Sequence, residues 1–294
     1  MEMEKKRIAV IGATGSQGKG VVDALVKHGG FQVRAVTRNA ETYSGPAHET
    51  VKADLDDADS LKEAFQDAYG VFAVTNFWAG ADELKQGKNA VEAAKQANVQ
   101  HFVWSTLPNV ESISRGEFHV PHFTGKAKVD EIVKRAGFPH HTFVQPPFYY
   151  QNFVGMLSAQ PKDDGTIGWT LPLDPVKKVI HMSDINDLGK VVAGAFLQPD
   201  AVGHGSYLSL ATEMNSFNDI LAAFKANGKD YSFTRVPGEV FSTFFEGAKE
   251  LTEMFGYFEK YTYMGPDSQT RIDRAKQTAQ VDFLSFDEWI KKGN

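Results

Sequence analysis

The sequence predicts an α/β fold: a doubly wound parallel sheet with a small C-terminal α/β lobe over the crevice at the carboxyl end of the sheet. Three observations support this prediction. Short apolar runs alternate with amphipathic helical segments through the first half of the chain, a glycine-rich turn follows the first run, and the alternation stops after Pro146-Pro147. Strands that alternate with helices in this way form a parallel sheet with helices on both faces.

Strands and helices alternate up to residue 145. The expected strands are short apolar runs at residues 8–11, 31–38, 49–53, 71–74, 101–105 and 141–145. The helices follow a helical apolar period: a first one with Val21, Val22, Leu25 and Val26 on one face, then residues 58–68, 82–97 and 123–136. Gly137, with Pro139 just beyond it, ends the last of these helices.

The second half of the chain has a weaker pattern. Residues 148–180 are rich in proline and glycine, and one further strand (179–182) and helix (184–196) are expected, with Ser183 as the N-cap. The Phe-rich segment 241–258 fits a helix packed on the core, and it fits a partner-binding face equally well. We expect this half to pack on the sheet as a lobe, so that residues 1–294 form a single domain.

Composition excludes several classes of protein. The formal net charge of -6 disfavours direct contact with nucleic acid or anionic membranes. The chain contains no cysteine, which excludes disulfides, thiolate catalysis and cysteine-based metal sites. Residues 1–7 have no apolar run typical of a secretory signal, and no stretch approaches the roughly 20 apolar residues of a membrane span. We therefore expect a cytoplasmic protein.

The glycine-rich turn is the strongest functional motif. It lies between the first strand and the first helix and reads Gly12, Ala13, Thr14, Gly15, Ser16, Gln17 and Gly18. Pyrophosphate is bound by backbone amides without obstructing side chains and by the positive end of a helix dipole. Glycines alone are a weak signal, but the required strand–turn–helix context is present. The motif predicts a Rossmann-type dinucleotide-binding core in residues 1–150, with residues 151–294 mainly a substrate or partner lobe; a purely structural turn is the alternative.

The end of the second strand predicts the type of dinucleotide. An acid there would bind the 2′-hydroxyl of NAD, whereas arginine suits the 2′-phosphate of NADP. Arg38 occupies this place and neither Thr37 nor Asn39 is acidic, which favours NADP(H) over a merely solvated arginine. Asp54, after the third strand, would accept a hydrogen bond from the adenine amine, or it is an acid that precedes the next helix; the two interpretations are balanced.

These motifs, together with Thr75-Asn76-Phe77-Trp78 and His122-Phe123-Thr124-Gly125-Lys126, resemble the NmrA-like family of atypical short-chain dehydrogenases. The resemblance is specific from Arg7 to about Asn152 and looser to the C-terminal residues 286–290. Because Arg38 and the full glycine turn are kept, the chain looks closest to the NADPH-sensing branch of that family.

The resemblance implies further cofactor contacts. Arg38 with Asn39 to Thr42 would surround the 2′-phosphate, and Asp54-Leu55 would flank adenine. The residues implied along the rest of the cofactor are Thr75, Asn76, Phe77 and Lys85, then Lys126 at the nicotinamide ribose, and Tyr149, Tyr150, Gln151 and Asn152 at the nicotinamide end.

Catalysis is the open question. Typical short-chain dehydrogenases use Tyr-x-x-x-Lys, and here His122 stands four residues before Lys126 in place of the tyrosine. Imidazole can act as a general acid, but a neighbouring lysine favours its neutral form. The sequence narrowly favours a redox sensor that reports NADP(H) to a regulatory protein without turnover. An NADPH-dependent reductase of a small quinone, enone or carbonyl substrate, using Lys126 or His122, comes close behind, and a purely structural cofactor is the third interpretation.

Other features carry weaker expectations. His119 and His122 lack a carboxylate at fitting spacing, and Pro121 should interrupt a helix there, so no metal is expected. The aromatic run 148–150 is interpreted as a pocket wall rather than ordinary core. The substrate, the protein partner, a homodimer and traffic into the nucleus stay open.

Overall fold

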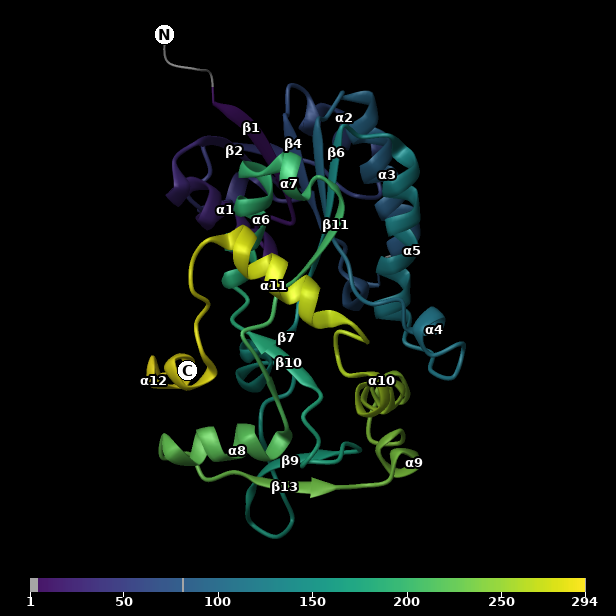
Figure 1. The fold of residues 1–294 in the computed structure, drawn as a ribbon, viewed down its shortest axis with the longest axis vertical. Helices are drawn as coiled ribbons and strands as arrows, with labels where there is room; N and C mark the ends of the chain where they lie inside the picture. Colours follow the sequence, from purple (N-terminus) through teal and green to yellow (C-terminus); the bar gives the residue numbers. More distant parts are fainter. Residues whose placement is uncertain (1–4, 81, 294) are drawn as a thin grey trace.

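The main sheet has seven parallel strands in the order β11-β6-β5-β4-β1-β2-β3 (Figure 1). The structure, a computed structural model, describes residues 5–80 and 82–293, so most of the N-terminal segment predicted to lack a signal lies outside the described residues. The strands are β1 (Lys6–Ile11), β2 (Phe31–Thr37), β3 (Glu49–Lys52), β4 (Gly70–Ala73), β5 (His101–Ser105), β6 (His140–Gln145) and β11 (His204–Ser209). The order reverses direction beside β1, and such switch points are where open α/β sheets bind ligands.

Helices cover both faces of this sheet, as predicted. On one face α1 (Ser16–His28) and α6 (Asp187–Leu197) bury their apolar sides against β1 and β2. On the other face lie α2 (Ala58–Phe65), α3 (Glu83–Gln96) and α5 (Pro121–Ala136). The apolar period that predicted α1 accounts for its buried residues Val21, Val22 and Leu25. The doubly wound α/β prediction is thereby confirmed.

The second half of the chain contributes to the main sheet, which the predicted division at residue 150 did not foresee. Strand β11 pairs with β6 at the edge, and α11 (Ser268–Ala279) packs on α6 and β11. A Cβ atom on Gly189 would lie 2.1 Å from the carbonyl oxygen of Gly20, so α6 can approach α1 this closely only without a side chain there. The sheet-bearing core therefore includes residues from both halves.

The C-terminal lobe is built on two small sheets below the main one (Figure 1). One contains β7 (Phe148–Tyr149), β10 (Ile180–Ser183) and β12 (Glu213–Asn215); the other contains β8 (Gln160–Pro161), β9 (Ile167–Leu171) and β13 (Ser232–Arg235). The lobe helices are α8 (Phe217–Ala226), α9 (Gly238–Phe241), α10 (Ala248–Tyr261) and α12 (Phe286–Lys291). Because β7 follows directly on β6, the lobe lies at the carboxyl end of the main sheet.

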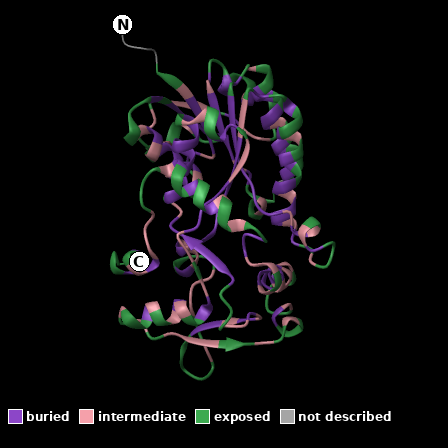
Figure 2. Ribbon diagram, viewed as in Figure 1, coloured by how far each residue is buried: buried purple, intermediate pink, exposed green. Residues whose placement is uncertain are grey.

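Aromatic side chains form the core of the lobe. Phe153 packs against Trp169, Phe224 and Phe286 with ring centroids 5.5–5.8 Å apart. Figure 2 shows buried residues in the strands of the main sheet and again in the strands of the lobe. The Phe-rich segment is divided between α9 and α10, with Phe255 and Phe258 buried, whereas Phe244 and Phe245 are about half exposed (48% and 50%).

Short elements complete the chain. They are η1 (Ala40–Thr42), η2 (Phe77–Ala79), η3 (Tyr150–Val154), α4 (Val110–Ile113) and α7 (Pro199–Val202). None of the described helices combines the length and the apolar character that crossing a membrane requires.

Candidate functional site

The glycine turn joins β1 to α1 in a conformation that depends on glycine. Gly12 has a φ of 68°, in the left-handed region that favours glycine, and its carbonyl oxygen accepts a hydrogen bond of 2.8 Å from the Gly15 amide. Gly15 is the N-cap of α1, so no side chain caps the helix, and the first turn contains no acid. Thr14, Gly15 and Ser16 are exposed, whereas Ala13 is buried. This helix terminus therefore suits an anionic group.

Gly18 lets the turn lie against the helix. A Cβ atom at this position would lie 2.1 Å from the carbonyl oxygen of Gly12, so any side chain would push the turn away from α1. Gln17 connects the same turn to β5, because the Ser105 hydroxyl donates a 2.7 Å hydrogen bond to the side-chain oxygen of Gln17. The cradle thus fits a dinucleotide pyrophosphate in backbone shape as well as in sequence.

Arg38 directly follows β2, at the same end of the sheet. Its side chain is exposed and makes no hydrogen bond or ion pair with any described residue. Beyond it, the Asn39 amide donates to the Thr37 hydroxyl (3.3 Å), and the Thr42 hydroxyl donates to the Asn39 carbonyl (3.3 Å). The segment is therefore a short ordered loop with a free guanidinium, which is suited to a phosphate.

The residues assigned to adenine lie at the start of α2. One Asp54 carboxylate oxygen accepts from the Asp56 amide (3.0 Å), and the N-cap of α2 is Asp57. Leu55 offers its carbonyl to the Asn89 side chain (2.8 Å). Lys85 is exposed and pairs with Asp56 at 2.9 Å, so it would have to leave that partner to reach a cofactor.

Lys126 lies in a buried polar cluster beyond β4. Its ammonium donates to the carbonyl oxygen of Thr75 (2.7 Å) and to the Thr75 hydroxyl oxygen (2.8 Å), and it pairs with a Glu83 carboxylate oxygen at 2.7 Å. The Thr75 hydroxyl donates to the same Glu83 oxygen (2.8 Å). Burial lowers the pKa of Lys126, and the charge and hydrogen bond of Glu83 oppose that effect.

Glu83 is a residue of this cluster that the sequence did not predict. It opens α3, and nothing in its spacing distinguishes it from the other acids near residue 82. Its second carboxylate oxygen is buried and has no hydrogen-bond partner among the described residues, and a Cβ atom on Gly125 would lie 2.9 Å from it. The glycine that precedes Lys126 therefore leaves room for this carboxylate.

His122 lies one turn before Lys126, inside α5. As expected, no helix carries both His119 and His122, because Pro121 is the first residue of α5, where proline needs no backbone donor; the helix begins two residues before the predicted start at 123. The His122 Nδ1 atom lies 2.5 Å from Glu250 of α10, and the His122 amide donates to the same oxygen (3.0 Å). His119 pairs with a different carboxylate, Glu111, at 2.7 Å.

Aromatic rings from the segment after β4 surround His122. The ring centroid of Phe77 lies 5.9 Å from the imidazole and that of Trp78 5.0 Å, and Trp78 is 48% exposed. Asn76, the N-cap of η2, is exposed beside them. Thr75, Phe77, His122 and Lys126 are thus brought together at the carboxyl end of β4, next to the switch point.

The fold and the cluster of Thr75, Phe77, His122 and Lys126 occur in a chain that is similar to known proteins. A model of the NmrA-like family matches residues 4–290. The chain belongs to the NmrA-like family. It is 28% identical over 316 residues to the NmrA-like family domain-containing oxidoreductase lnaB of Aspergillus flavus, covering 97% of this chain and 93% of that protein.

Solved structures share the fold of this NmrA-like protein. The structure of NmrA, a negative transcriptional regulator, in complex with NADP superposes with a TM-score of 0.82 at 24% identity, covering 99% of this chain and 95% of that one. An NADPH-dependent quinone oxidoreductase of Escherichia coli, complexed with NADPH, gives 0.78 at 18% identity, covering 97% and 99%. At these identities the likeness shows the fold.

Of the residues assigned to the nicotinamide end, Tyr150 lies in the core of the NmrA-like lobe. Its hydroxyl donates to Glu213 (2.9 Å) and also lies 3.2 Å from the Leu284 carbonyl oxygen, so the buried hydroxyl has a partner. Gln151 accepts from the Ile185 amide (3.1 Å), and Asn152 accepts from turn amides through its carbonyl. The Tyr149 hydroxyl is buried without a hydrogen-bond partner among described residues, and burial raises its pKa well above the usual value.

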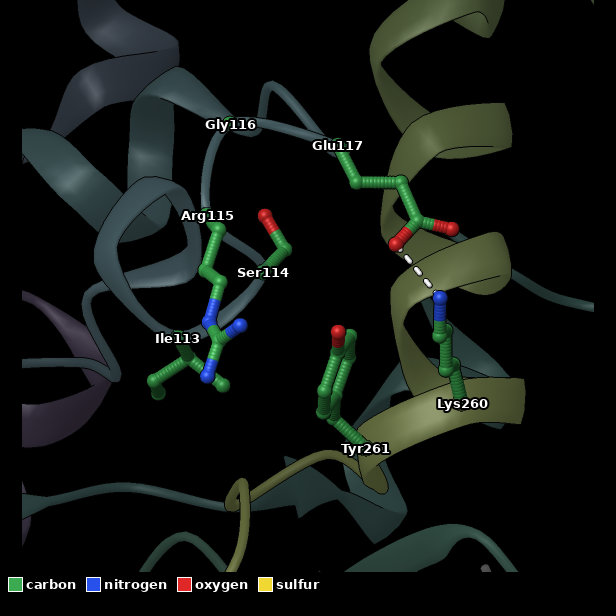
Figure 3. Close-up of a pocket in the computed structure, with 7 residues that line it drawn as sticks. All are labelled: Ile113, Ser114, Arg115, Gly116, Glu117, Lys260 and Tyr261. Carbon is green, nitrogen blue, oxygen red and sulfur yellow. Dashed lines mark hydrogen bonds and ion pairs between the residues drawn. The ribbon is translucent and has the colours of Figure 1, made fainter.

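A pocket elsewhere in the NmrA-like fold does not belong to this site. A cavity of about 610 Å³ lies between α4 and the end of α10 (Figure 3). Figure 3 shows Lys260 paired with Glu117 (2.5 Å) at its edge and the side chains of Arg115 and Tyr261 along it. No residue of the glycine turn or of the Lys126 cluster lines this pocket.

Proposed function

We propose that this protein is an NADPH-dependent reductase of a small planar substrate with an electrophilic carbon, a quinone or an enone. The observation that carries the proposal is the pair of His122 and Lys126 on one face of α5, with the His122 imidazole held by Glu250 and packed against Phe77 and Trp78. A proton donor, a cation and an aromatic wall thus meet at the carboxyl end of the sheet.

The chain's residues fit NADP(H). The backbone of Gly12 to Gly18 would hold the pyrophosphate, and the free Arg38 guanidinium would bind the 2′-phosphate. Lys126 would contact the nicotinamide ribose by exchanging one of its two contacts to Thr75. When bound, NADPH supplies a hydride to the substrate carbon. His122, with both ring nitrogens protonated, supplies the matching proton from Nε2 to the substrate oxygen, keeps the proton on Nδ1 and regains the other from solvent, so that a two-electron reduction is balanced.

On sequence alone, a sensor without turnover was favoured because the tyrosine of Tyr-x-x-x-Lys is absent. The carboxylate at Nδ1 weakens that argument, because it holds the imidazole in one orientation and leaves the opposite ring nitrogen, Nε2, free to face a substrate. Relatives named as oxidoreductases support the same proposal.

The redox sensor remains a second candidate, since the His122–Glu250 pair joins a helix of the core to a helix of the lobe beside the cofactor residues. Binding of NADPH would change the conformation of the lobe through this contact if the protein has two conformations that differ in their affinity for NADPH. NADPH would then change protease sensitivity, oligomeric state or partner binding without turnover.

Steady-state oxidation of NADPH with menadione and 2-cyclohexenone tests the proposal. We expect turnover in the unchanged chain, loss in Lys126→Ala and His122→Gln, and little change in Lys128→Ala, an exposed lysine of the same helix. Calorimetry should show that Arg38→Ala weakens NADPH about 10- to 100-fold and leaves NADH unaffected, as the loss of a charge-assisted hydrogen bond implies. Arg135→Ala, exposed at the end of α5, is the control. Absence of turnover together with an NADPH-dependent change in protease sensitivity would favour the sensor.

A further inference from the structure

We propose that Glu250 is a positioning residue: it holds the His122 imidazole with Nδ1 protonated, so that Nε2 is the atom presented to the substrate. The inference rests on the proposed reductase function and names a part of the site that the C-terminal lobe contributes. Nothing in the sequence connects residues 122 and 250, which lie far apart along the chain.

One carboxylate oxygen makes both contacts. Glu250 Oε1 accepts from the backbone amide of His122 at 3.0 Å and lies 2.5 Å from its Nδ1 atom. The two side chains are only 10% and 16% exposed, so water has little access to either partner. A backbone contact and a ring contact to one oxygen fix the His122 side chain relative to its own helix.

The identity of the acceptor decides which ring nitrogen keeps a proton. An ionised carboxylate can only accept hydrogen bonds, so the proton of the contact lies on Nδ1. Nε2 is on the opposite edge of the ring and makes no hydrogen bond within the described part of the chain. The ring cannot readily turn over to exchange the two nitrogens, because Trp78 and Phe123 pack against it at 5.0 and 4.8 Å between centroids.

The charges around the pair suit a proton donor. Burial raises the pKa of Glu250, but the hydrogen bonds and charge of His122, with a smaller effect of His119, outweigh it and lower the pKa overall. Glu250 is therefore ionised near neutral pH. The cation of Lys126, one turn further along α5, is already paired with Glu83, so the carboxylate in contact with the imidazole is that of Glu250.

The first experiment compares Glu250→Gln with Glu253→Gln in steady-state kinetics with menadione and NADPH. Glutamine keeps the shape but loses the charge, and its amide both donates and accepts, so it no longer dictates the tautomer. We expect kcat to fall about 10- to 100-fold, with the KM for NADPH within about twofold of the unchanged value. Glu250→Asp, which keeps the charge, should recover part of the loss. Glu253 lies on the same helix and, among the described residues, accepts only from the His119 amide (3.2 Å), so its variant should keep the original kcat.

The second experiment needs no turnover. Two-bond ¹H–¹⁵N spectra of the imidazoles, with His122→Gln for assignment, should show a protonated Nδ1 in the chain without NADPH and an altered nitrogen pattern in Glu250→Gln. A deprotonated Nδ1 in the unchanged chain, an unchanged pattern in Glu250→Gln, or equal kinetic losses in the two glutamine variants would each overturn the inference. Absence of menadione reduction by the unchanged chain would overturn the proposed reductase, and the nitrogen spectra would then decide the role of Glu250 alone.

Discussion

The ammonium of Lys126 lies 2.7 Å from the Glu83 carboxylate, and the two side chains are only 9% and 4% exposed. Two further contacts to Thr75 complete the surroundings of the ammonium. A buried charge is costly unless a partner of opposite charge and hydrogen bonds compensate for it. Glu83 is therefore the residue that allows Lys126 to remain charged in this place.

Replacing Glu83 by glutamine should destabilise the protein by about 3 kcal/mol near pH 7, because the Lys126 ammonium stays buried without its counter-charge. Burial already lowers the pKa of Lys126, and removal of Glu83 lowers it further. A lysine with a depressed folded pKa costs stability below its unfolded pKa of 10.5, so the loss should shrink as the pH rises toward that value. Urea unfolding at pH 7 and at pH 9.5 measures both effects.

The controls for this prediction come from the same two helices. Glu92→Gln removes an exposed acid of α3 that pairs with Lys88 at 3.7 Å, and it should change stability by less than about 1 kcal/mol. Combining Glu83→Gln with Lys126→Met should recover much of the loss, because no unpaired charge remains. A double variant as unstable as the sum of the two single variants would contradict this account.

The sequence predicted the main sheet well because its signals are local. Strand β5 was predicted with its observed bounds, and the glycine turn lies where the motif required. Strand β11 was missed, because His204–Ser209 is short and polar at its start and is specified mainly by pairing with β6. An edge strand that joins the sheet from the second half of the chain has no alternating hydrophobic pattern by which the sequence would predict it.

The site was predicted only in part for a similar reason. Residues adjacent to motifs, such as Arg38 and Lys126, are recognisable from their neighbours in sequence. Glu83 contacts a residue of another helix, Lys126 of α5, and Glu250 contacts His122 of the same helix α5. Such contacts between separate helices cannot be predicted from a sequence, because a buried glutamate and an exposed one are the same residue type. Tyr150 shows the opposite error: an aromatic next to the site was assigned to the cofactor, whereas its ring packs on Phe286 and Trp289.

His101 should make the protein sensitive to acid. It is fully buried in β5, its Nε2 atom lies 2.9 Å from the Thr142 hydroxyl, and burial, with the nearby His140, lowers its pKa to about 3. The unfolded chain binds a proton near the ordinary histidine pKa of 6.5 and the folded chain does not, so stability is present above pH 6.5 and is lost as the pH falls toward 3. The expected slope is about 1.4 kcal/mol per pH unit.

Urea unfolding from pH 7 to pH 4 checks this expectation in the unchanged chain and in His101→Leu. The leucine variant loses the hydrogen bond to Thr142 and is less stable throughout, but its free energy of unfolding should depend less steeply on pH. His28→Gln, which removes an exposed histidine at the end of α1, is the matched control and should keep the original slope. Equal slopes in the leucine variant and the unchanged chain would contradict the assignment.

Asp130 should have the opposite dependence on pH. It lies buried in α5, where it accepts from the Tyr207 hydroxyl at 2.8 Å, and burial raises its pKa to about 7 against the effect of that hydrogen bond. The folded chain retains a proton that the unfolded chain releases near 3.8, so this contribution to stability is full below 3.8 and is lost as the pH rises through 7. Between about pH 4 and 6.5 it opposes the contribution of His101.

Asp130→Asn should therefore be more stable than the unchanged chain at pH 8, by about 2–4 kcal/mol, and similar to it at pH 4. The asparagine oxygen can still accept from Tyr207, while the cost of ionising a buried carboxyl disappears. Glu131→Gln, on the exposed face of the same helix, should stay within about 1 kcal/mol at both pH values. Urea unfolding at pH 4 and pH 8 separates the cases. An asparagine variant less stable than the unchanged chain at pH 8 would mean that the ionised Asp130 stabilises the fold, and the negative charge would then need a partner that its present contacts do not supply.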